Sequence, residues 1–359
     1  MRVLAALSGG VDSSVTAALL QDQGHQVVGV TMKLWGGESD SGCCSVSDVE
    51  DARRAAAQLD VDHHVFNFGE EFEEHVIAPY VADHLAGRTP NPCVECNRRL
   101  KFDVLLRRAE MLGFDAVATG HHARVVTVAD GTRRIGRGAD TAKDQSYVLY
   151  PLTAIELERV LLPIGEMTKD VVRERAAALH LRTATKPDSQ DVCFITRTDG
   201  RAAFLEQRAE LHPGRIVDTD GTQVGTVSAV ELVTIGQRRG LNLAGGSGRR
   251  FVVDVDVASA TVTVGPPQHL LRDEVALDTM VWATEPVRGR VRVQCSAHGA
   301  ASDALVDLQQ DGRVIVRFDE PQRRVAAGQS VVLYQQMETV GPDGTPVIDE
   351  VVVGGGLAV

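Results

Sequence analysis

The sequence predicts an α/β fold, with a parallel-sheet domain followed by two small antiparallel β-barrel domains. In the first half of the 359-residue chain, apolar strand-like runs alternate with helical patterns, which is typical of a parallel sheet with helical crossovers. After about residue 200, short Val-rich runs alternate apolar with polar residues and are separated by Asp-Gly and Gly-Pro turns. We therefore expect domains over 1–200, 201–272 and 273–359.

The elements of the first domain follow one another in order. Apolar runs predict strands at 2–7, 25–32, 63–68 and 114–120. Helical patterns predict helices at 14–24, 45–60, 70–85 and 97–113, with Asn97 as a cap of the last. Ligands of such sheets bind beyond the carboxyl ends of the strands, so the segments that follow strands are the first candidates for a site.

The strands of the two barrels are expected where Val-rich runs alternate with polar residues. These runs lie at 214–227, 249–265, 290–295, 311–320 and 329–335. Aromatic residues make up only 4% of the chain, so we expect cores built from Val, Leu, Ala and Ile.

The composition excludes several classes of protein. No apolar run approaches the roughly 18 residues of a membrane span, and the first apolar stretch is too short for a signal-peptide core. We therefore expect a cytoplasmic protein without a membrane partner. Its six cysteines then favour metal binding or catalysis over a disulfide framework. The net charge of −12 argues against broad coating of nucleic acid, although basic residues gather at 88–108 and 133–143.

The motif SGGVDSS, residues 8–14, lies at the predicted turn from the first strand to the first helix. Its glycines allow a tight turn that presents N–H groups, and its serines supply hydroxyl donors. The helix that follows points its positive end at the loop. No Lys follows the glycines, so this is not the usual P-loop. The alternative is an ordinary Gly turn before a Ser-capped helix, but the full motif after a strand favours a phosphate site.

SGGVDS resembles the pyrophosphate loop of the ATP pyrophosphatase (PP-loop) superfamily, whose Rossmann-like enzymes transfer AMP to an oxygen and release pyrophosphate. The resemblance implies ATP with Mg²⁺, and Asp12 as a partner of magnesium and pyrophosphate. The ATP site that it implies consists of Ala6, Leu7, Ser8, Gly9, Gly10, Val11, Asp12, Ser13, Met32 and Gly120.

Segments later in the chain point to one family within this superfamily. The chain contains, in order, GRTPNPCVECNRRLKF (87–102), ATGHHAR (118–124), KDQSYVLY (143–150), KPDSQDVCFI (186–195) and TIGQRRGL (234–241). Together these are similar to the tRNA-specific 2-thiouridylases of the MnmA/TrmU family. The resemblance implies replacement of the 2-oxygen of the wobble uridine by sulfur, in tRNAs for Lys, Glu and Gln. It implies tRNA and a persulfide donor, such as a cysteine desulfurase or a relay protein, as partners.

The same resemblance implies roles for individual residues. Cys193 would carry the persulfide, and Cys96 would release the sulfur by forming a disulfide with Cys193. Cys96 lies just before the helix expected from Asn97, where a helix N-terminus favours a thiolate. The implied contacts with tRNA or with the target base are Asn91, Pro92, Cys93, His121, Lys143, Asp144, Gln145 and Gln329.

Cys93 departs from the commonest form of the family, which has an acid–base Asp at this position. The thiol could replace that Asp as acid or base. Alternatively, Cys93, Cys96 and Cys193 could hold a [4Fe–4S] cluster with one open iron, or a zinc ion that lacks a fourth ligand. His122 stands where the family usually has Tyr. The last barrel lacks the family's basic–aromatic segment, so its tRNA contacts would depend on other arginines.

Two hypotheses from other classes stay open. A synthetase with the same ATP site could use ammonia, which requires no cysteine pair, although we identify no glutaminase domain. A nucleotide-binding redox or iron sensor could hold a cluster without turnover. Cys43 and Cys44 are interpreted as buried residues near a helix start, and Cys295 as structural.

Overall fold

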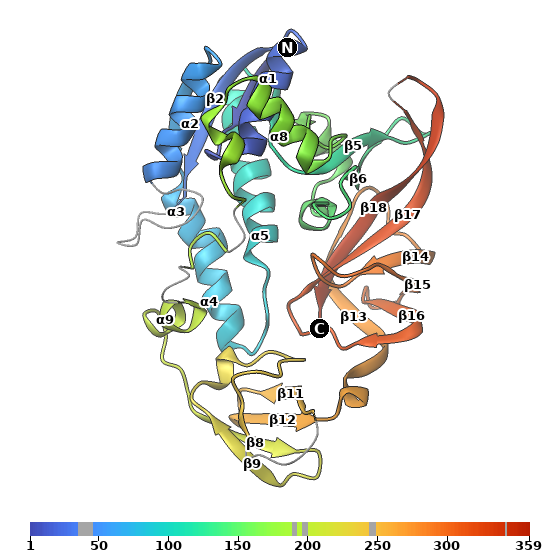
Figure 1. Cartoon of the computed structure of the whole chain (residues 1–359). Coiled ribbons are helices and arrows are strands. Elements are labelled where there is room, and N and C mark those ends of the chain that lie inside the picture. The colour runs from blue at the N-terminus through green and yellow to red at the C-terminus, as the bar shows by residue number, and fades with distance from the viewer. Residues whose placement is uncertain (35–45, 189–191, 196–199, 244–248, 342) are drawn as a thin grey trace.

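The structure is a computed structural model that describes residues 1–34, 46–188, 192–195, 200–243, 249–341 and 343–359. Figure 1 shows a parallel-sheet domain at the top, a small sheet at the bottom and a β-barrel at the right. Long helical segments lead from the parallel sheet down to the small sheet. No helix among the described residues is both long and apolar enough to cross a membrane.

The first domain is built on a five-stranded parallel sheet with the strand order β3-β2-β1-β4-β7. All four strands expected from the sequence are present, and a short fifth strand, β7, was not predicted. Side chains alternate between two cores, with Val3 and Ala5 on one face and Leu4 and Ala6 on the other. The strands are β1 Arg2–Ala6, β2 Gln26–Lys33, β3 Asp62–Asn67, β4 Ala116–Ala118 and β7 Val160–Leu161.

Helices cover both faces of this sheet, as the alternating pattern predicts. The sequence did not predict α8, whose apolar residues Val172 and Ala176 pack with Val11 and Val15 of α1. The helices are α1 Val11–Asp22, α2 Val46–Gln58, α3 Gly69–Phe72, η1 Glu73–Ile77, α4 Ala78–Leu85, α5 Pro92–Glu95, η2 Cys96–Val104, α6 Leu105–Met111, η3 Ser146–Leu149, α7 Ala154–Leu157, α8 Lys169–Ala178, η4 Arg182–Thr185 and α9 Gly200–Glu206.

The helix of the cysteine motif begins earlier than predicted. Elements α5, η2 and α6 follow without a break, so the helix starts at Pro92 and not at Asn97. Asn91 is the N-cap, and its side chain accepts a hydrogen bond from the N–H of Cys93 at 3.1 Å. Pro92 at the first helical position suits this start, because its ring fixes φ and the missing N–H would have no partner within the helix. The prediction that Asn97 caps the helix was therefore wrong.

The small central sheet has the strand order β10-β9-β8-β12-β11 around its own Val-rich core. Its neighbouring strands are antiparallel, as expected, except for β8 and β12, which pair in parallel. The elements are β8 Gly214–Asp218, β9 Gln223–Val227, η5 Val230–Leu232, β10 Asn242–Leu243, β11 Phe251–Asp256, β12 Thr261–Gly265 and η6 Pro267–Leu270.

The last part of the chain is a closed antiparallel barrel of six strands. The order is β13-β16-β15-β14-β17-β18, and pairing of β13 with β18 closes the ring. Closure leaves no free sheet edge within the ring. The strands are β13 Leu271–Trp282, β14 Gly289–Gln294, β15 Ser302–Leu308, β16 Val314–Arg323, β17 Ser330–Val340 and β18 Pro346–Ala358.

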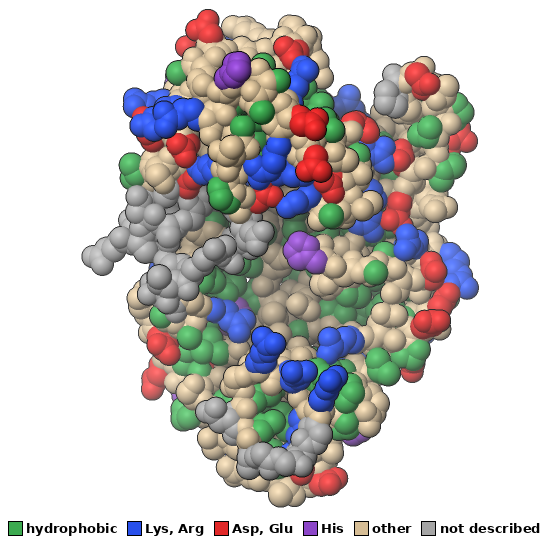
Figure 2. Space-filling view, in the orientation of Figure 1, with side chains coloured by type: hydrophobic (Ala, Val, Ile, Leu, Met, Phe, Trp, Pro, Cys, Tyr) green, Lys and Arg blue, Asp and Glu red, His purple; other side chains and the backbone are tan. Residues whose placement is uncertain are grey.

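A hairpin of the first domain extends the sheet of this barrel. Strands β5 Ala123–Thr127 and β6 Arg133–Arg137 pair with each other, and β6 pairs with β18 where Gly136 lies opposite Val351. Phe102 and Ile135 of the first domain share an apolar cluster with Val332 and Tyr334 of the barrel. The barrel is therefore packed directly on the first domain. Figure 2 shows a hollow in the middle of the face where the three parts meet, with Lys and Arg side chains below it.

Candidate active site

The loop after β1 has the geometry that its glycines predict. Gly9 has φ +74°, which favours glycine, and a Cβ at this position would lie 2.4 Å from the backbone oxygen of Asp48 in α2. Gly10 is the N-cap of α1 in an extended conformation. The loop is thus confined between the end of β1 and the start of α2.

The loop serines mainly bond within the loop. The hydroxyls of Ser13 and Ser14 both donate to the carbonyl of Gly10, at 3.1 and 2.9 Å. The N–H of Ser8 donates to the Ser13 hydroxyl at 3.1 Å. These bonds hold the loop in shape, so its anion-binding capacity rests on backbone N–H groups in the first turn of α1, which have no acceptor within the helix.

The other residues of the expected ATP site surround this loop. Leu7 is fixed by two bonds, from its N–H to Val30 and from the Thr31 hydroxyl to its carbonyl, both at 2.8 Å. Ala6 ends β1, and Val11 begins α1. Met32, in β2, packs against the core that contains Ala6.

Gly120 follows β4 and contacts the first turn of α1. A Cβ on Gly120 would lie 2.7 Å from the backbone nitrogen of Ser13 and 2.8 Å from the carbonyl carbon of Asp12. The end of β4 therefore lies directly against the loop. The structure brings the ATGHH and SGGVDS motifs together, which their spacing in the sequence did not require.

Asp12 lies at the centre of a partly buried charge network. Its carboxylate pairs with the ammonium of Lys169, with both oxygens at 2.7 Å, and with Nε2 of His122 at 3.2 Å. Burial alone would raise the pKa of Asp12, but these partners hold it below its usual value. His122 Nδ1 is buried and has no hydrogen-bond partner among the described residues, so its ring contacts Asp12 through Nε2 alone.

Lys169 extends this network to the cysteine-bearing segment. It lies 2.9 Å from Asp188, which also pairs with Lys143 at 2.7 Å and with Arg173 at 2.8 Å. Burial opposes the shift, but Lys143 and Lys169 lower the pKa of Asp188 to about 2. Asp188 lies five residues before Cys193, so one lysine connects the phosphate loop to that segment.

Lys169 was not predicted from the sequence as a site residue. It is the first residue of α8 and is only 7% exposed. A cation at this position opposes the helix dipole, which favours acidic residues in the first turn. A Lys directly after the N-cap Thr168 was therefore an available signal that the residue serves something outside its own helix.

The two cysteines of NPCVEC lie in different environments. Cys93 is in the first turn of the helix and is exposed, whereas Cys96 is in the second turn and is only 8% exposed within an apolar cluster. The position at the helix N-terminus that was expected for Cys96 therefore belongs to Cys93. This correction follows from the earlier helix start at Pro92.

Cys193 packs against the apolar cluster that contains Cys96. Its neighbour Phe194 anchors the segment in edge-to-face contacts with Phe72 and Tyr80, at ring distances of 5.7 and 5.3 Å. The fold thus brings two cysteines that are far apart in sequence to one cluster. Cys43 and Cys44 lie outside the described residues.

A metal site formed by the three cysteines is not found in the part of the chain that the structure describes. Among the described residues, which include all three, no group of three or more Cys, His, Asp or Glu side chains is placed to hold a metal ion. Cys295 is half-buried, and burial raises its pKa to about 12, in keeping with a structural interpretation.

The residues expected to contact tRNA are spread around this site. His121 is buried, its Nδ1 lies 2.7 Å from the hydroxyl of Thr119, and burial holds its pKa well below the usual value, so it is neutral. Gln329 follows Gly328, whose Cβ position lies 3.0 Å from Arg88, just before the cysteine motif. Lys143 pairs with Asp188, as described above.

Two of these residues make contacts within the protein. Asp144 accepts hydrogen bonds from Arg137 and from the N–H of Gly138, both at 2.9 Å. The side chain of Gln145 accepts a bond from the N–H of His122, also at 2.9 Å. Their predicted role in tRNA binding stays a prediction.

Comparison with protein families covers nearly the whole chain. Residues 1–197 match the model described as the tRNA methyl transferase HUP domain. Residues 202–266 match the tRNA methyl transferase PRC-barrel domain, and residues 272–345 match the aminomethyltransferase beta-barrel domain.

Curated relatives are similar over their full length. The chain is 46% identical to the tRNA-specific 2-thiouridylase MnmA of Chloroflexus aggregans, over 94% of this chain and 96% of the relative. It is 47% identical to the protein of the same name from Beutenbergia cavernae, over 95% of this chain and 93% of the relative.

The similar solved structures have lower sequence identity to this chain and cover less of it. A 4-thiouridine synthetase in complex with RNA and ATP is 18% identical with a TM-score of 0.37, over 54% of this chain and 44% of that one. The U34-tRNA thiolase NcsA from Methanococcus maripaludis, with its [4Fe-4S] cluster, is 16% identical with a TM-score of 0.35, over 58% of this chain and 65% of that one.

Proposed function

This chain belongs to the tRNA-specific 2-thiouridylase family, and on that premise we propose that it is an ATP-dependent tRNA-uridine 2-sulfurtransferase that passes sulfur through Cys193 and Cys96. Full-length relatives at 46–47% identity support thiolation of a tRNA uridine. The wobble position, the tRNAs for Lys, Glu and Gln, and the cytoplasmic location stay predictions from the resemblance.

The first step activates the uridine 2-oxygen, which is a poor leaving group. The oxygen attacks the α-phosphorus of ATP, an O–P bond forms, and the bond to pyrophosphate breaks. The N–H groups at the start of α1 would bind phosphate oxygens, and Asp12 would hold Mg²⁺, which neutralises phosphate charge. Lys169 lies 2.7 Å from the Asp12 carboxylate, so its ammonium is within reach of phosphates bound at this loop.

The second step transfers sulfur with balanced electrons. The terminal sulfur of a Cys193 persulfide attacks C2 of the adenylated uridine. The Cys96 thiolate then attacks the inner sulfur of Cys193, which forms the Cys96–Cys193 disulfide and leaves one reduced sulfur on C2. AMP departs with the original 2-oxygen. A dithiol reductant restores the two thiols before the persulfide donor loads Cys193 again.

The different environments of the cysteines support this division of roles. Cys96 is buried in the apolar cluster, where bulk oxidants have little access, and Cys193 is half-buried on the same cluster. Cys93 is exposed in the first turn of a helix, where the positive end of the helix dipole favours a thiolate. We infer that Cys93 serves as acid or base near the target uridine, in place of the Asp of the common family form.

The alternatives receive less support. A cluster held by Cys93, Cys96 and Cys193 would require three ligands placed around one site, and no group of three potential metal ligands is found among the described residues. An ammonia-dependent synthetase would have no use for two cysteines on one cluster. A sensor would bind nucleotide without turnover, and relatives named tRNA-specific 2-thiouridylases favour an enzyme instead.

The observation that carries the proposal is the shared cluster, because it includes Cys96, contacts Cys193 and reaches Ala6 at the end of β1. The test incubates the purified chain with ATP, tRNA and a persulfide donor, and measures 2-thiouridine by mass spectrometry of tRNA nucleosides. We expect Cys193→Ala and Cys96→Ala to abolish the product, and Cys295→Ala to retain it. Undiminished 2-thiouridine from Cys193→Ala would contradict the proposal. Release of AMP and pyrophosphate with ammonia in place of the sulfur donor would favour the synthetase.

A further inference from the structure

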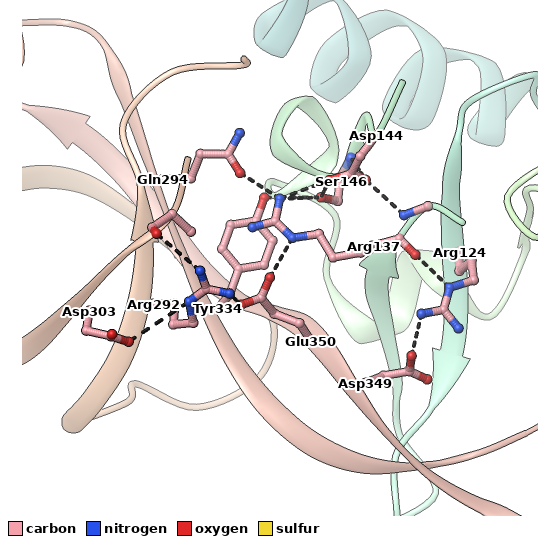
Figure 3. Close-up of polar contacts among 12 residues, drawn as sticks. Arg124, Arg137, Asp144, Ser146, Arg292, Gln294, Asp303, Tyr334, Asp349 and Glu350 are labelled. Atoms are coloured by element: carbon pink, nitrogen blue, oxygen red, sulfur yellow. Dashed lines mark hydrogen bonds and ion pairs between the residues drawn. The ribbon is translucent and has the colours of Figure 1, made fainter. Parts of the chain in front are cut away.

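Arg137, the last residue of β6, contacts side chains from three strands of the barrel (Figure 3). Its guanidinium lies 3.6 Å from the centre of the Tyr334 ring on β17. Its Nε donates to Glu350 on β18 at 2.8 Å, and its Nη1 donates to Gln294 on β14 at 2.6 Å. A planar guanidinium that stacks and donates in its own plane has one well-defined orientation.

The same guanidinium holds the segment that follows it, residues 138–146, which we name the strap. Nη1 of Arg137 donates to Asp144 at 2.9 Å. The other oxygen of Asp144 accepts from the N–H groups of Gly138 and Ser146, at 2.9 and 3.1 Å. The Asp144 side chain is only 9% exposed, so both ends of the strap are tied to one buried carboxylate beside Arg137.

The strap reaches the candidate active site at three points. Asp140 accepts a hydrogen bond from the N–H of Lys169 at 2.9 Å. Lys143 pairs with Asp188 at 2.7 Å. Gln145 binds the backbone of His122 twice, by accepting from its N–H at 2.9 Å and donating to its carbonyl at 2.8 Å.

These contacts form one continuous path. The barrel holds Arg137 in place, and Arg137 binds Asp144. Lys143, on one side of Asp144, binds Asp188, and Gln145, on the other side, binds His122. His122 and Lys169 are the two described partners of the Asp12 carboxylate. Arg124 of the same interface pairs with Asp349 and Glu166 and donates to the carbonyl of Arg137. It makes no hydrogen bond or ion pair to the strap among the described residues.

We propose that Arg137 is a positioning residue for the nucleotide site. It uses the docked barrel to hold the strap, and the strap holds Lys169, His122 and Asp188 around Asp12. This inference rests on the proposed function only in assigning Mg-ATP to the loop of residues 8–14. The barrel is then part of the catalytic apparatus and not only a surface for tRNA.

The test measures the affinity of the purified full chain for Mg-ATP by isothermal titration calorimetry, without tRNA or sulfur donor. Arg137→Lys keeps the positive charge but removes the planar guanidinium that stacks on Tyr334 and forms several hydrogen bonds. We expect this variant to raise the Kd for Mg-ATP about tenfold, within the range of couplings between linked sites. The matched control is Asp349→Asn, which breaks the neighbouring ion pair of the same interface and leaves the strap intact. We expect it to change the melting temperature but not the Kd.

A double-mutant cycle separates positioning from general loosening. In a Gln145→Ala background, the effect of Arg137→Lys on the Kd is expected to shrink, because both act on His122 through the strap. If Arg137→Lys does not fold, Glu350→Gln replaces it, and we expect weaker Mg-ATP binding than in Asp349→Asn.

Three outcomes overturn different claims. Equal Kd values for the wild-type chain, Asp349→Asn and the Arg137→Lys or Glu350→Gln variant would overturn the positioning role alone. A wild-type chain that does not bind Mg-ATP would overturn the proposed nucleotide site. Full additivity of Arg137→Lys and Gln145→Ala would show that Arg137 does not act through the strap.

Discussion

Two charge networks of this protein use similar groups in different ways. In one, Lys169 lies between Asp12 of the phosphate loop and Asp188 of the cysteine-bearing segment. In the other, Arg137 lies between Asp144 of the strap and Glu350 of the barrel. The carboxylates of the first network are 29% and 21% exposed, and those of the second are 9% and 15% exposed.

The difference between the cations explains the difference in use. An ammonium on a flexible stem is a point charge that can exchange one oxygen partner for another, so Lys169 can turn from carboxylates to phosphates when a nucleotide arrives. A guanidinium stacked on Tyr334 and bonded in its plane cannot exchange partners without losing several contacts at once. The first network is thus suited to chemistry, and the second to holding two domains in register.

The largest effect is expected from Lys169→Met, which removes the cation shared by the loop and the cysteine-bearing segment. Removing one preorganised charge from a reaction centre typically costs a factor of about 10²–10³ in rate. We expect tRNA-dependent pyrophosphate release to fall by about that factor. The matched control is Lys186→Met, which also removes a lysine that pairs with two acids, Asp48 and Asp51. Equal losses of pyrophosphate release in the two variants would contradict a special role of Lys169 in the reaction.

The next largest effect is expected at the loop itself, where two adjacent glycines serve as an internal comparison. Gly9→Ala places a side chain at φ +74° and against the backbone of α2, and we expect it to cost about 1–3 kcal/mol in the free energy of unfolding and to weaken Mg-ATP binding. Gly10 has φ −96°, and among the described residues the atom that lies near its Cβ position is the Ser8 hydroxyl oxygen, at 3.5 Å. Gly10→Ala is therefore expected to be tolerated, as chemical denaturation and calorimetry can check.

A smaller effect is expected in the second network from Tyr334→Phe. This variant keeps the ring under Arg137 and removes the hydroxyl that lies 3.1 Å from Ser146. Losing one such buried hydrogen bond costs about 1 kcal/mol. We expect that decrease in the free energy of unfolding, measured in urea, with an unchanged Kd for Mg-ATP. If Tyr334→Phe changed the Kd for Mg-ATP, stacking on the Tyr334 ring would not be sufficient to hold Arg137 in place.

The smallest effect concerns pH. The pKa of Asp188 is about 2 in the folded chain, below its usual value of 3.8. Its ion pairs therefore contribute stability above about pH 4, and this contribution is lost as the pH falls through about 2. Comparing the wild-type chain with Asp188→Asn in urea between these pH values, we expect their difference in stability to shrink as the pH falls. A constant difference would contradict the lowered pKa.

Local patterns predicted the elements whose signals lie within a few residues. The buried strands of the parallel sheet are continuous apolar runs. The phosphate loop can be recognised by the glycines that directly follow such a run. The start of the cysteine helix was mispredicted although Asn91 and Pro92 carried the signal, because Asn97 also resembles a cap. That error assigned the helix N-terminus to Cys96 instead of Cys93.

Features that depend on long-range pairing could not be predicted. Arg137 and Glu350 are 213 residues apart, and nothing in the basic run around Arg137 distinguishes an interdomain anchor from a solvated surface. The β5–β6 hairpin joins the barrel through its contact with β18, so its place depends on a strand near the other end of the chain. The joining of Asp12, Lys169 and Asp188 likewise follows from the fold and not from spacing.

Peptide mass spectrometry can follow the proposed passage of sulfur through Cys193, with Cys96 as its resolving partner. The chain is loaded with a persulfide donor under anaerobic conditions, digested without reductant, and compared before and after one turnover with ATP and tRNA. We expect one added sulfur atom on the Cys193 peptide before turnover, and a Cys96–Cys193 disulfide after it. Added sulfur on neither cysteine, together with stoichiometric iron and sulfide lost only in a triple variant of Cys93, Cys96 and Cys193, would contradict the account.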